Sequence, residues 1–193
     1  DMAISYNGMN IDARNLKTTL LRKAGKNEEA KALAHEVLEF NPLNYYAANE
    51  LVLLGAKQDS ELGKLLRGVP ESYLELALYY YNNGFVKEAK DILTASETVR
   101  PYPTVEYWLG FLADADGNAE LARNWFKAAE SKDIDYVFPF RLETIKALDK
   151  ALEYNPNSFN TWYYLGNLYY QKQPQKALAC WEKAVEAKPD FAM

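Results

Sequence analysis

Residues 158–189, SFNTWYYLGNLYYQKQPQKALACWEKAVEAKP, decide the fold of this chain. Within this stretch two aromatic residues flank a leucine–glycine pair in the spacing W-x2-L-G-x2-Y, from Trp162 to Tyr169. An alanine, a third aromatic residue and a closing proline follow, at Ala177, Trp181 and Pro189. Ser158 is of a residue type that caps the first turn of a helix, and the residue before a proline avoids helical backbone angles. The stretch therefore predicts helical structure that begins after Ser158 and ends before Pro189.

This order of residues resembles the tetratricopeptide repeat, a helix–turn–helix unit of about 34 residues. In that family, small residues at the positions of Gly166 and Ala177 let two helices approach closely, and the aromatic residues fill the space between helices. The resemblance implies an all-α chain whose hairpins stack into a right-handed superhelix, or α-solenoid, of the kind that binds other proteins. The stretch departs from the family pattern in one place, because Ala177 stands eight rather than nine positions after Tyr169 and Pro174 lies between them.

The same landmarks recur along the chain and indicate further repeats. An alanine and a proline twelve residues apart occur three times, in the pairs Ala30–Pro42, Ala89–Pro101 and Ala177–Pro189. Independent support for helices comes from an apolar stripe at Leu142, Ile145, Leu148 and Leu152. We therefore predict one domain of tetratricopeptide-like repeats over residues 1–193, in which the second and fifth units are degenerate. The units are about 11–42, 44–68, 70–100, 104–131, 140–155 and 158–188.

Composition indicates a folded protein and argues against several functions. Hydrophobic residues make up 49% of the chain and charged residues 25%, far from the composition of disordered chains. The net charge of -5 argues against a nucleic-acid binder, which needs a basic face, and no apolar run approaches the ~18 residues of a membrane span. The single cysteine excludes an internal disulfide and is compatible with the cytoplasm. A chain that begins at Asp1 is also compatible with an exported fragment, so the compartment stays open.

In the repeat family, the concave face of the stack is lined mainly by the first helix of each hairpin. Carried over position by position, the resemblance implies an aromatic-lined groove that binds a peptide or a protein. Aromatic side chains suit this role because they offer contact area at low entropic cost. The alternative is that the rings pack against neighbouring helices. The predicted groove residues are Tyr81, Tyr107, Trp108, Phe111, Tyr163, Tyr164, Asn167 and Tyr170.

No arrangement of catalytic, cofactor-binding or metal-ligating residues is recognisable. His35 is the only histidine, which excludes a site with several histidines, and a surface contact with Glu39 is its simpler role. Residues 114–120, DADGNAE, resemble part of a calcium loop, but the glycine and the acidic residues stand at the wrong positions, so we expect an inter-helix turn. Cys180 has no partner in its unit and is expected to be buried. The sequence predicts a protein that is not an enzyme and holds no cofactor or metal.

The helix expected over residues 175–187 is broadly apolar, whereas the last helix of a solenoid usually has a polar outer face. We therefore expect this end to pack on further sequence or on a second copy of the chain, which would form a homo-oligomer through the C-terminal helix.

A weaker resemblance covers the whole chain, including residues 136–143 and 163–170. The chain is similar to the C-terminal helical-repeat part of large bacterial proteins with a β-rich N-terminal domain of unassigned function, which resembles carbohydrate-handling folds. This resemblance implies an alternative function, a rigid structural arm that packs on another domain of a larger bacterial protein.

Overall fold

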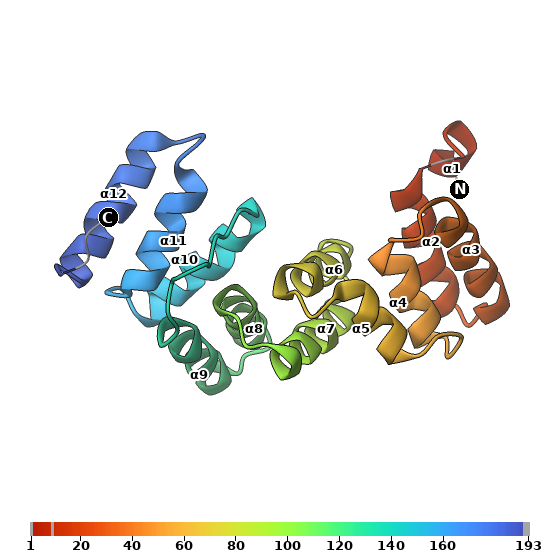
Figure 1. Cartoon of the computed structure of the whole chain (residues 1–193), viewed down its shortest axis with the longest axis horizontal. Coiled ribbons are helices and arrows are strands. Elements are labelled where there is room, and N and C mark those ends of the chain that lie inside the picture. The colour runs from red at the N-terminus through yellow and green to blue at the C-terminus, as the bar shows by residue number, and fades with distance from the viewer. Residues whose placement is uncertain (1, 9, 191–193) are drawn as a thin grey trace. The chain divides into compact units, whose positions relative to one another are not determined.

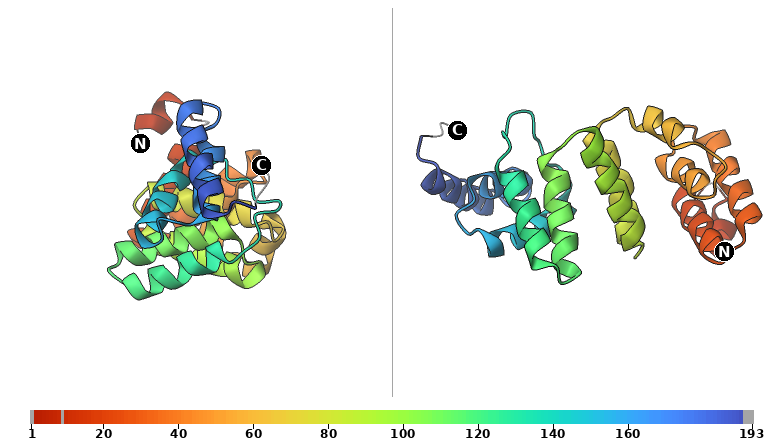
Figure 2. Two further views of the ribbon diagram at one scale, coloured as in Figure 1. Left: turned by 90° about the vertical axis from the view of Figure 1, so that its left-hand side faces the viewer. Right: turned by 90° about the horizontal axis from the view of Figure 1, so that it is seen from below.

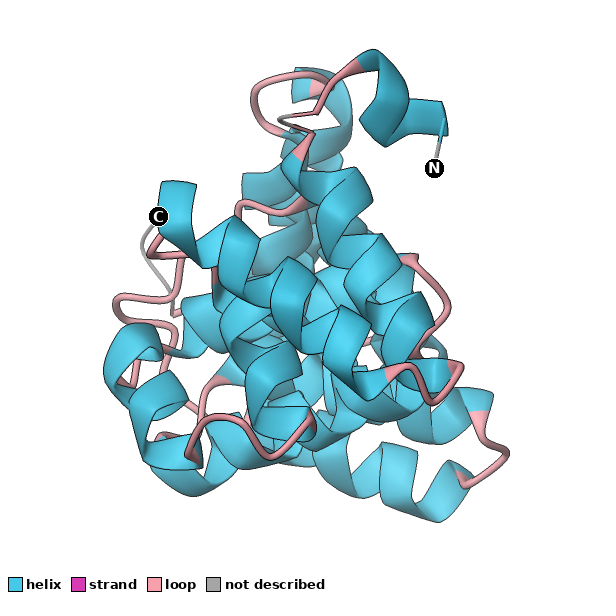
Figure 3. Ribbon diagram, turned by 90° about the vertical axis from the view of Figure 1, so that its right-hand side faces the viewer, coloured by secondary structure: helices cyan, strands magenta, loops and turns pink. Residues whose placement is uncertain are grey.

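The computed structural model describes residues 2–8 and 10–190, which are mostly helical (Figure 1). These residues form twelve α-helices, one short 3-10 helix (η1) and no β-strand. Figure 3 distinguishes the helices from the loops by colour. The prediction of an all-α fold is confirmed. The helices are α1 (Met2–Tyr6), α2 (Ile11–Lys23), α3 (Asn27–Phe40), α4 (Tyr45–Leu53), α5 (Asp59–Leu66), α6 (Pro70–Asn82), α7 (Val86–Val99), α8 (Pro103–Ala115), α9 (Ala119–Glu130), η1 (Leu142–Thr144), α10 (Ile145–Tyr154), α11 (Phe159–Tyr169) and α12 (Pro174–Ala187).

The chain divides into two compact units, residues 1–92 and 93–193. The first unit holds α1 to α6 and the beginning of α7, and the second unit holds the end of α7 and α8 to α12. The single repeat domain over residues 1–193 stays a prediction.

Two helices of the first unit, α2 and α4, begin at side chains that satisfy free backbone N–H groups. The Asn10 side chain accepts a hydrogen bond from the N–H of Ala13 at 2.9 Å, which starts α2. Asn44 starts α4 in the same way, with the N–H of Ala47 at 2.7 Å. The turn between α2 and α3 contains Gly25 with a φ of 74°, a left-handed angle that glycine adopts without strain. Helices α3 and α4 then pack through a small apolar core of Ala34, Val37, Ala47 and Leu51.

The second unit contains two hairpins, α8–α9 and α11–α12. In each hairpin a glycine of the first helix meets an aromatic ring of the second. A Cβ atom on Gly110 would lie 2.5 Å from the ring of Phe126, and one on Gly166 would overlap the indole of Trp181. Only a residue without a side chain allows such an approach. The close helix contact predicted at Gly166 is therefore confirmed, and the ring it meets is that of Trp181.

Helix α10 stands between the two hairpins of the second unit and packs on α8 and α11. It buries one face through Ala147, Leu148 and Ala151. The segment before it, residues 131–141, is irregular, and Tyr136 has a φ of 60°, which is uncommon outside glycine. This loop extends away from the helices around it in the right-hand view of Figure 2, where it is drawn in teal. The predicted lone helical segment over residues 140–155 thus corresponds to η1 and α10.

Candidate functional site

Three of the eight predicted groove residues are buried inside the second unit. Tyr107, Trp108 and Tyr164 expose at most 1% of their surface. The Tyr107 hydroxyl shares a hydrogen bond with Thr161 Oγ1 at 2.8 Å, and Trp108 Nε1 donates to Thr144 Oγ1 at 3.3 Å. Burial raises the pKa of the Tyr107 and Tyr164 phenols. The structure therefore corrects the prediction that these three rings line an accessible groove. They are packing residues inside the second unit.

These three rings are buried because additional chain lies between the α8–α9 and α11–α12 hairpins. A position-by-position transfer assumes that each hairpin is followed directly by the next one. Here η1 and α10 lie between α9 and α11 in the sequence, and α10 packs on α8. Thr144 of η1 reaches the indole of Trp108, and Thr161 of α11 reaches the hydroxyl of Tyr107. The rings of α8 are therefore covered by the chain itself.

Two further predicted residues are half-buried. Phe111 on α8 lies edge-on to Trp108, with ring centroids 5.5 Å apart, and Lys146 Nζ is 6.0 Å from the Phe111 centroid. Tyr81 lies on α6 in the first unit. Neither Phe111 nor Tyr81 lines the pocket in which the remaining three predicted residues meet.

Tyr163, Asn167 and Tyr170 come together at one pocket of the second unit. Its volume is about 600 Å³, within the range of natural ligand-binding pockets. We call it the aromatic groove, because five of its lining residues carry aromatic rings. The aromatic groove is lined by Phe138, Pro139, Phe140, Leu142, Tyr163, Asn167, Leu168, Tyr170, Gln171, Lys172 and Trp181.

One wall of the aromatic groove is the α11–α12 hairpin. Trp181 Nε1 donates a hydrogen bond to Asn167 Oδ1 at 3.2 Å, and the Trp181 and Tyr170 ring centroids are 5.7 Å apart. Gly166 makes this wall possible, because its missing side chain lets the indole lie against α11. The bond to Trp181 orients the Asn167 amide, whose N–H groups are its hydrogen-bond donors. This wall combines aromatic surface with a fixed polar group.

The other wall is the loop that leads into η1. Phe138, Phe140 and Leu142 are 68%, 62% and 56% exposed, and the Arg141 guanidinium carbon is 4.8 Å from the Phe140 ring centroid. Large apolar side chains exposed together mark interaction surfaces. Sequence reasoning did not include these residues in the site. The signal that could have found them is the apolar run YVFPF at 136–140, which no helical period explains.

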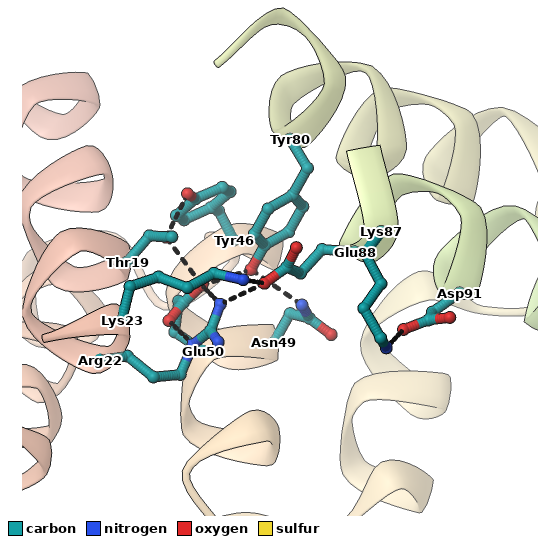
Figure 4. A network of polar contacts seen from close by, with 10 residues as sticks. All are labelled: Thr19, Arg22, Lys23, Tyr46, Asn49, Glu50, Tyr80, Lys87, Glu88 and Asp91. Carbon is teal, nitrogen blue, oxygen red and sulfur yellow. Dashed lines mark hydrogen bonds and ion pairs between the residues drawn. The ribbon is translucent and has the colours of Figure 1, made fainter. Parts of the chain in front are cut away.

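A cluster of mostly buried polar side chains lies in the first unit (Figure 4). The fully buried carboxylate of Glu50 accepts hydrogen bonds from the Thr19 and Tyr80 hydroxyls and from Arg22 Nε, each at 2.7 Å. Arg22 Nη2 also lies 3.0 Å from Glu88 Oε1. These contacts join α2, α4, α6 and α7. We call the cluster the charged core, and it consists of Thr19, Arg22, Lys23, Tyr46, Asn49, Glu50, Tyr80 and Glu88.

Three ionisable groups of the charged core, Arg22, Tyr80 and Glu88, have shifted pKa values. Burial alone would lower the pKa of Arg22, but the hydrogen bond and the charge of Glu50 outweigh burial and raise it. Burial raises the pKa of Tyr80, and the charge of Glu50 raises it further. Burial alone would raise the pKa of Glu88, but hydrogen bonds from Lys23 and Arg22 outweigh burial and lower it. All three shifts move the pKa values of these groups away from neutral pH.

The lowered pKa of Glu88 predicts a loss of stability in acid. The unfolded chain takes up a proton on Glu88 at a higher pH than the folded chain does, so the stabilisation is present above the unfolded pKa and is lost as the pH falls through the folded pKa. Glu88→Gln removes this dependence. We expect the difference in urea midpoint between wild type and Glu88→Gln to shrink from about pH 5 to about pH 3. A constant difference across this range would contradict the assignment.

The candidate catalytic and metal-binding residues do not gather into a site. Among the residues that the structure describes, no group of three or more His, Cys, Asp or Glu side chains could hold a metal ion. His35 is exposed on α3, Cys180 is buried, and burial raises the pKa of its thiol. The segment 114–120 forms the expected inter-helix turn, in which Asn118 caps α9 through the N–H of Leu121 at 3.1 Å.

Helix α12 buries more of its apolar face than the sequence suggested. Ala177, Cys180 and Ala184 are buried, whereas Leu178 is exposed. Packing of this helix on a second copy stays a prediction. None of the helices between residues 2 and 190 is long and apolar enough to cross a lipid bilayer.

Comparison with known protein families identifies the repeat class of the α11–α12 hairpin. Residues 159–191 match the family model of the tetratricopeptide repeat. The resemblance predicted from the spacing between Trp162 and Pro189 is confirmed for this hairpin, α11–α12. Proteins built from stacked helical repeats of this kind present extended surfaces that bind other proteins. No curated protein matches the chain.

Several solved repeat structures align with most of the chain at low similarity. A chain of the APC/C hetero-tetramer Cut9–Hcn1 aligns over 98% of this chain and 42% of that chain, with 16% identity and a TM-score of 0.34. MamA aligns over 89% and 94%, with 18% identity and a TM-score of 0.33. YrrB, described as a TPR protein with an unusual peptide-binding site, aligns over 98% and 92%, with 19% identity and a TM-score of 0.29. This chain spans less than half the length of the Cut9–Hcn1 chain.

Proposed function

We propose that this protein is a non-catalytic interaction scaffold that binds an extended peptide segment of another protein in the aromatic groove. The observation that carries the proposal is the groove itself. Phe138, Phe140 and Tyr170 are each more than half exposed around one pocket, although such rings are usually buried in a folded protein. The match of α11–α12 to a repeat class that binds proteins supports the same role.

The chemistry of the aromatic groove favours a peptide with apolar or aromatic anchor residues. Rings supply contact area without many rotatable bonds, so little conformational entropy is lost when a partner binds. Asn167 and Gln171 offer amide groups that can pair with a peptide backbone. Lys172 lines the groove and no carboxylate does, so an acidic residue beside the anchors would be favoured over a basic one.

The test is a selection of random peptides of about twelve residues on the immobilised protein, followed by fluorescence anisotropy with the selected peptide. We expect Tyr170→Ala and Phe138→Ala each to weaken binding at least about tenfold, since aromatic anchors dominate such interfaces. Both variants should keep the wild-type far-UV circular dichroism spectrum, because both side chains are mostly exposed.

The matched control is Tyr6→Ala. Tyr6 is also an exposed tyrosine, at 90%, but it lies on α1 in the first unit. This variant should bind the selected peptide like wild type. The groove assignment would be overturned by a selection that yields no peptide. It would also be overturned if the selected peptides bind the Tyr170→Ala and Phe138→Ala variants as tightly as wild type. The alternative function as a rigid arm on another domain of a larger protein would bury the same rings, and it stays a prediction.

A further inference from the structure

A second pocket lies entirely within the first unit and shares no residue with the aromatic groove. Its volume is about 300 Å³. Helix α2, the segment before α4, α4 itself and α6 each contribute to its lining. We call it the polar pocket, and the residues that carry the argument are Asp12, Asn15, Tyr45, Tyr46, Glu75 and Tyr79.

Asn15 places a hydrogen-bond acceptor at the polar pocket. Its side chain is buried, with 2% of the residue exposed, and its Oδ1 atom accepts no hydrogen bond from the residues that the structure describes. The neighbouring Tyr79 hydroxyl does not serve this oxygen, because it donates to the backbone oxygen of Asp12 at 2.9 Å. The Asn15 oxygen therefore lacks a donor among the described residues. Buried polar atoms in folded proteins normally have such a partner.

The negative charge of the polar pocket favours a positively charged hydrogen-bond donor. Two carboxylates, Asp12 and Glu75, line the pocket, and no lysine, arginine or histidine does. Burial raises the pKa of Tyr79, and the negative charge of Asp12 raises it further, which is consistent with a negative potential at this place. A cationic donor therefore meets favourable charge here, and an anionic one meets repulsion.

The aromatic residues that line the polar pocket favour a guanidinium group over an ammonium group. Tyr45, Tyr46 and Tyr79 supply ring surface next to the carboxylates. A guanidinium group is planar, stacks on aromatic rings and carries five N–H donors, so it can serve an amide oxygen and carboxylates at once. An ammonium group is a more strongly hydrated point charge and gains less from ring surface.

We infer that the polar pocket binds an arginine side chain presented by a protein or peptide partner. The site is chemically distinct from the aromatic groove and does not depend on the function proposed for that groove. Its recognition is electrostatic and directional, because the amide oxygen of Asn15 selects a donor and the flanking carboxylates select positive charge.

The test uses the full chain, labelled with ¹⁵N, and four capped tripeptides, acetyl-Gly-X-Gly-amide with X as arginine, lysine, norleucine or glutamate. We expect the arginine peptide to shift the amide signals of residues 12–16, 43–46 and 75–79, with a dissociation constant on the order of millimolar for so small a ligand. The lysine peptide should bind several-fold more weakly. The norleucine and glutamate peptides should cause no saturable shift.

Two sets of variants test the named residues. Asn15→Leu removes the acceptor, and the double variant Asp12→Asn with Glu75→Gln removes the charge at two exposed positions. Each should weaken binding of the arginine peptide at least tenfold. Glu28→Gln is the charge-matched control, because Glu28 is exposed on α3 and away from the pocket, and it should bind like wild type. Because Asn15→Leu changes a buried residue, the double variant keeps the test decisive if Asn15→Leu does not fold.

Three results would overturn the inference. They are the absence of a saturable shift with the arginine peptide, equal shifts with the norleucine peptide, and binding that is unchanged in the double variant. Tyr170→Ala and Phe138→Ala should leave the arginine-peptide shifts unchanged. Failure of the polar pocket and failure of the aromatic groove are therefore distinguishable.

Discussion

Replacing Glu50 with alanine is expected to lower the free energy of unfolding by about 3–5 kcal/mol. The carboxylate of Glu50 is fully buried and accepts hydrogen bonds from Thr19, Arg22 and Tyr80, which come from α2 and α6. Without it, two hydroxyls lose their acceptor, and Arg22 keeps its ion pair with Glu88 but loses the one with Glu50. Leaving buried polar groups without partners costs more than losing the contact itself.

Urea denaturation followed by far-UV circular dichroism measures this effect. The matched control is Glu28→Ala, which removes an exposed glutamate whose ion pair with Lys31 is on the surface. Exposed pairs contribute about 0–1 kcal/mol, so the control should lie close to wild type. A Glu50→Ala variant as stable as the control would show that the charged core contributes nothing to the stability of the first unit.

Replacing Gly166 with leucine is expected to disrupt the α11–α12 hairpin. Even a Cβ atom at this position would overlap the indole of Trp181, which cannot move without breaking its hydrogen bond to Asn167. Overpacking of this kind costs about 1–3 kcal/mol and can cost more for a large side chain. We therefore expect Gly166→Ala to lower the midpoint of thermal unfolding and Gly166→Leu to abolish the native signal of tryptophan fluorescence.

Gly63 offers a matched control for the alanine change. It lies inside α5, and a Cβ atom added to it would have no other atom within 4 Å, so Gly63→Ala should stabilise the chain by up to about 1 kcal/mol through helix propensity. In a Trp181→Ala background, Gly166→Ala should no longer destabilise, because the overlapping ring is gone. Destabilisation that persists in that background would show that the cost arises elsewhere.

Local sequence signals predicted the helices well. Ser158 accepts a hydrogen bond from the N–H of Thr161 at 3.3 Å, as its position before α11 suggested, and Gly25 turns the chain between α2 and α3. Each of these features depends on only a few neighbouring residues, so spacing and residue type suffice to find it. The packing of α10 on α8 depends on contacts between distant residues, and no local pattern encodes it.

The candidate sites were only partly predictable for the same reason. Tyr163, Asn167 and Tyr170 do line the aromatic groove, whereas Tyr107, Trp108 and Tyr164 follow the same rule of position and are buried. Residue type and helical period place a ring on a face of a helix, but another part of the chain decides whether that face is covered. The charged core was not predicted at all, since Arg22 and Glu88 are 66 residues apart and no motif links them.

The charged core has a consequence for how this chain can be rearranged. In an array of helical repeats, a hairpin can be deleted or duplicated because it contacts only its neighbours. Deleting α2–α3 here would remove Thr19 and Arg22 and leave Glu50 without them, and duplicating it would add an arginine with no carboxylate to meet. The four helices that contribute to the charged core, α2, α4, α6 and α7, would therefore have to be transplanted together. The α11–α12 hairpin keeps its glycine–tryptophan contact within itself, so that contact would move with the hairpin.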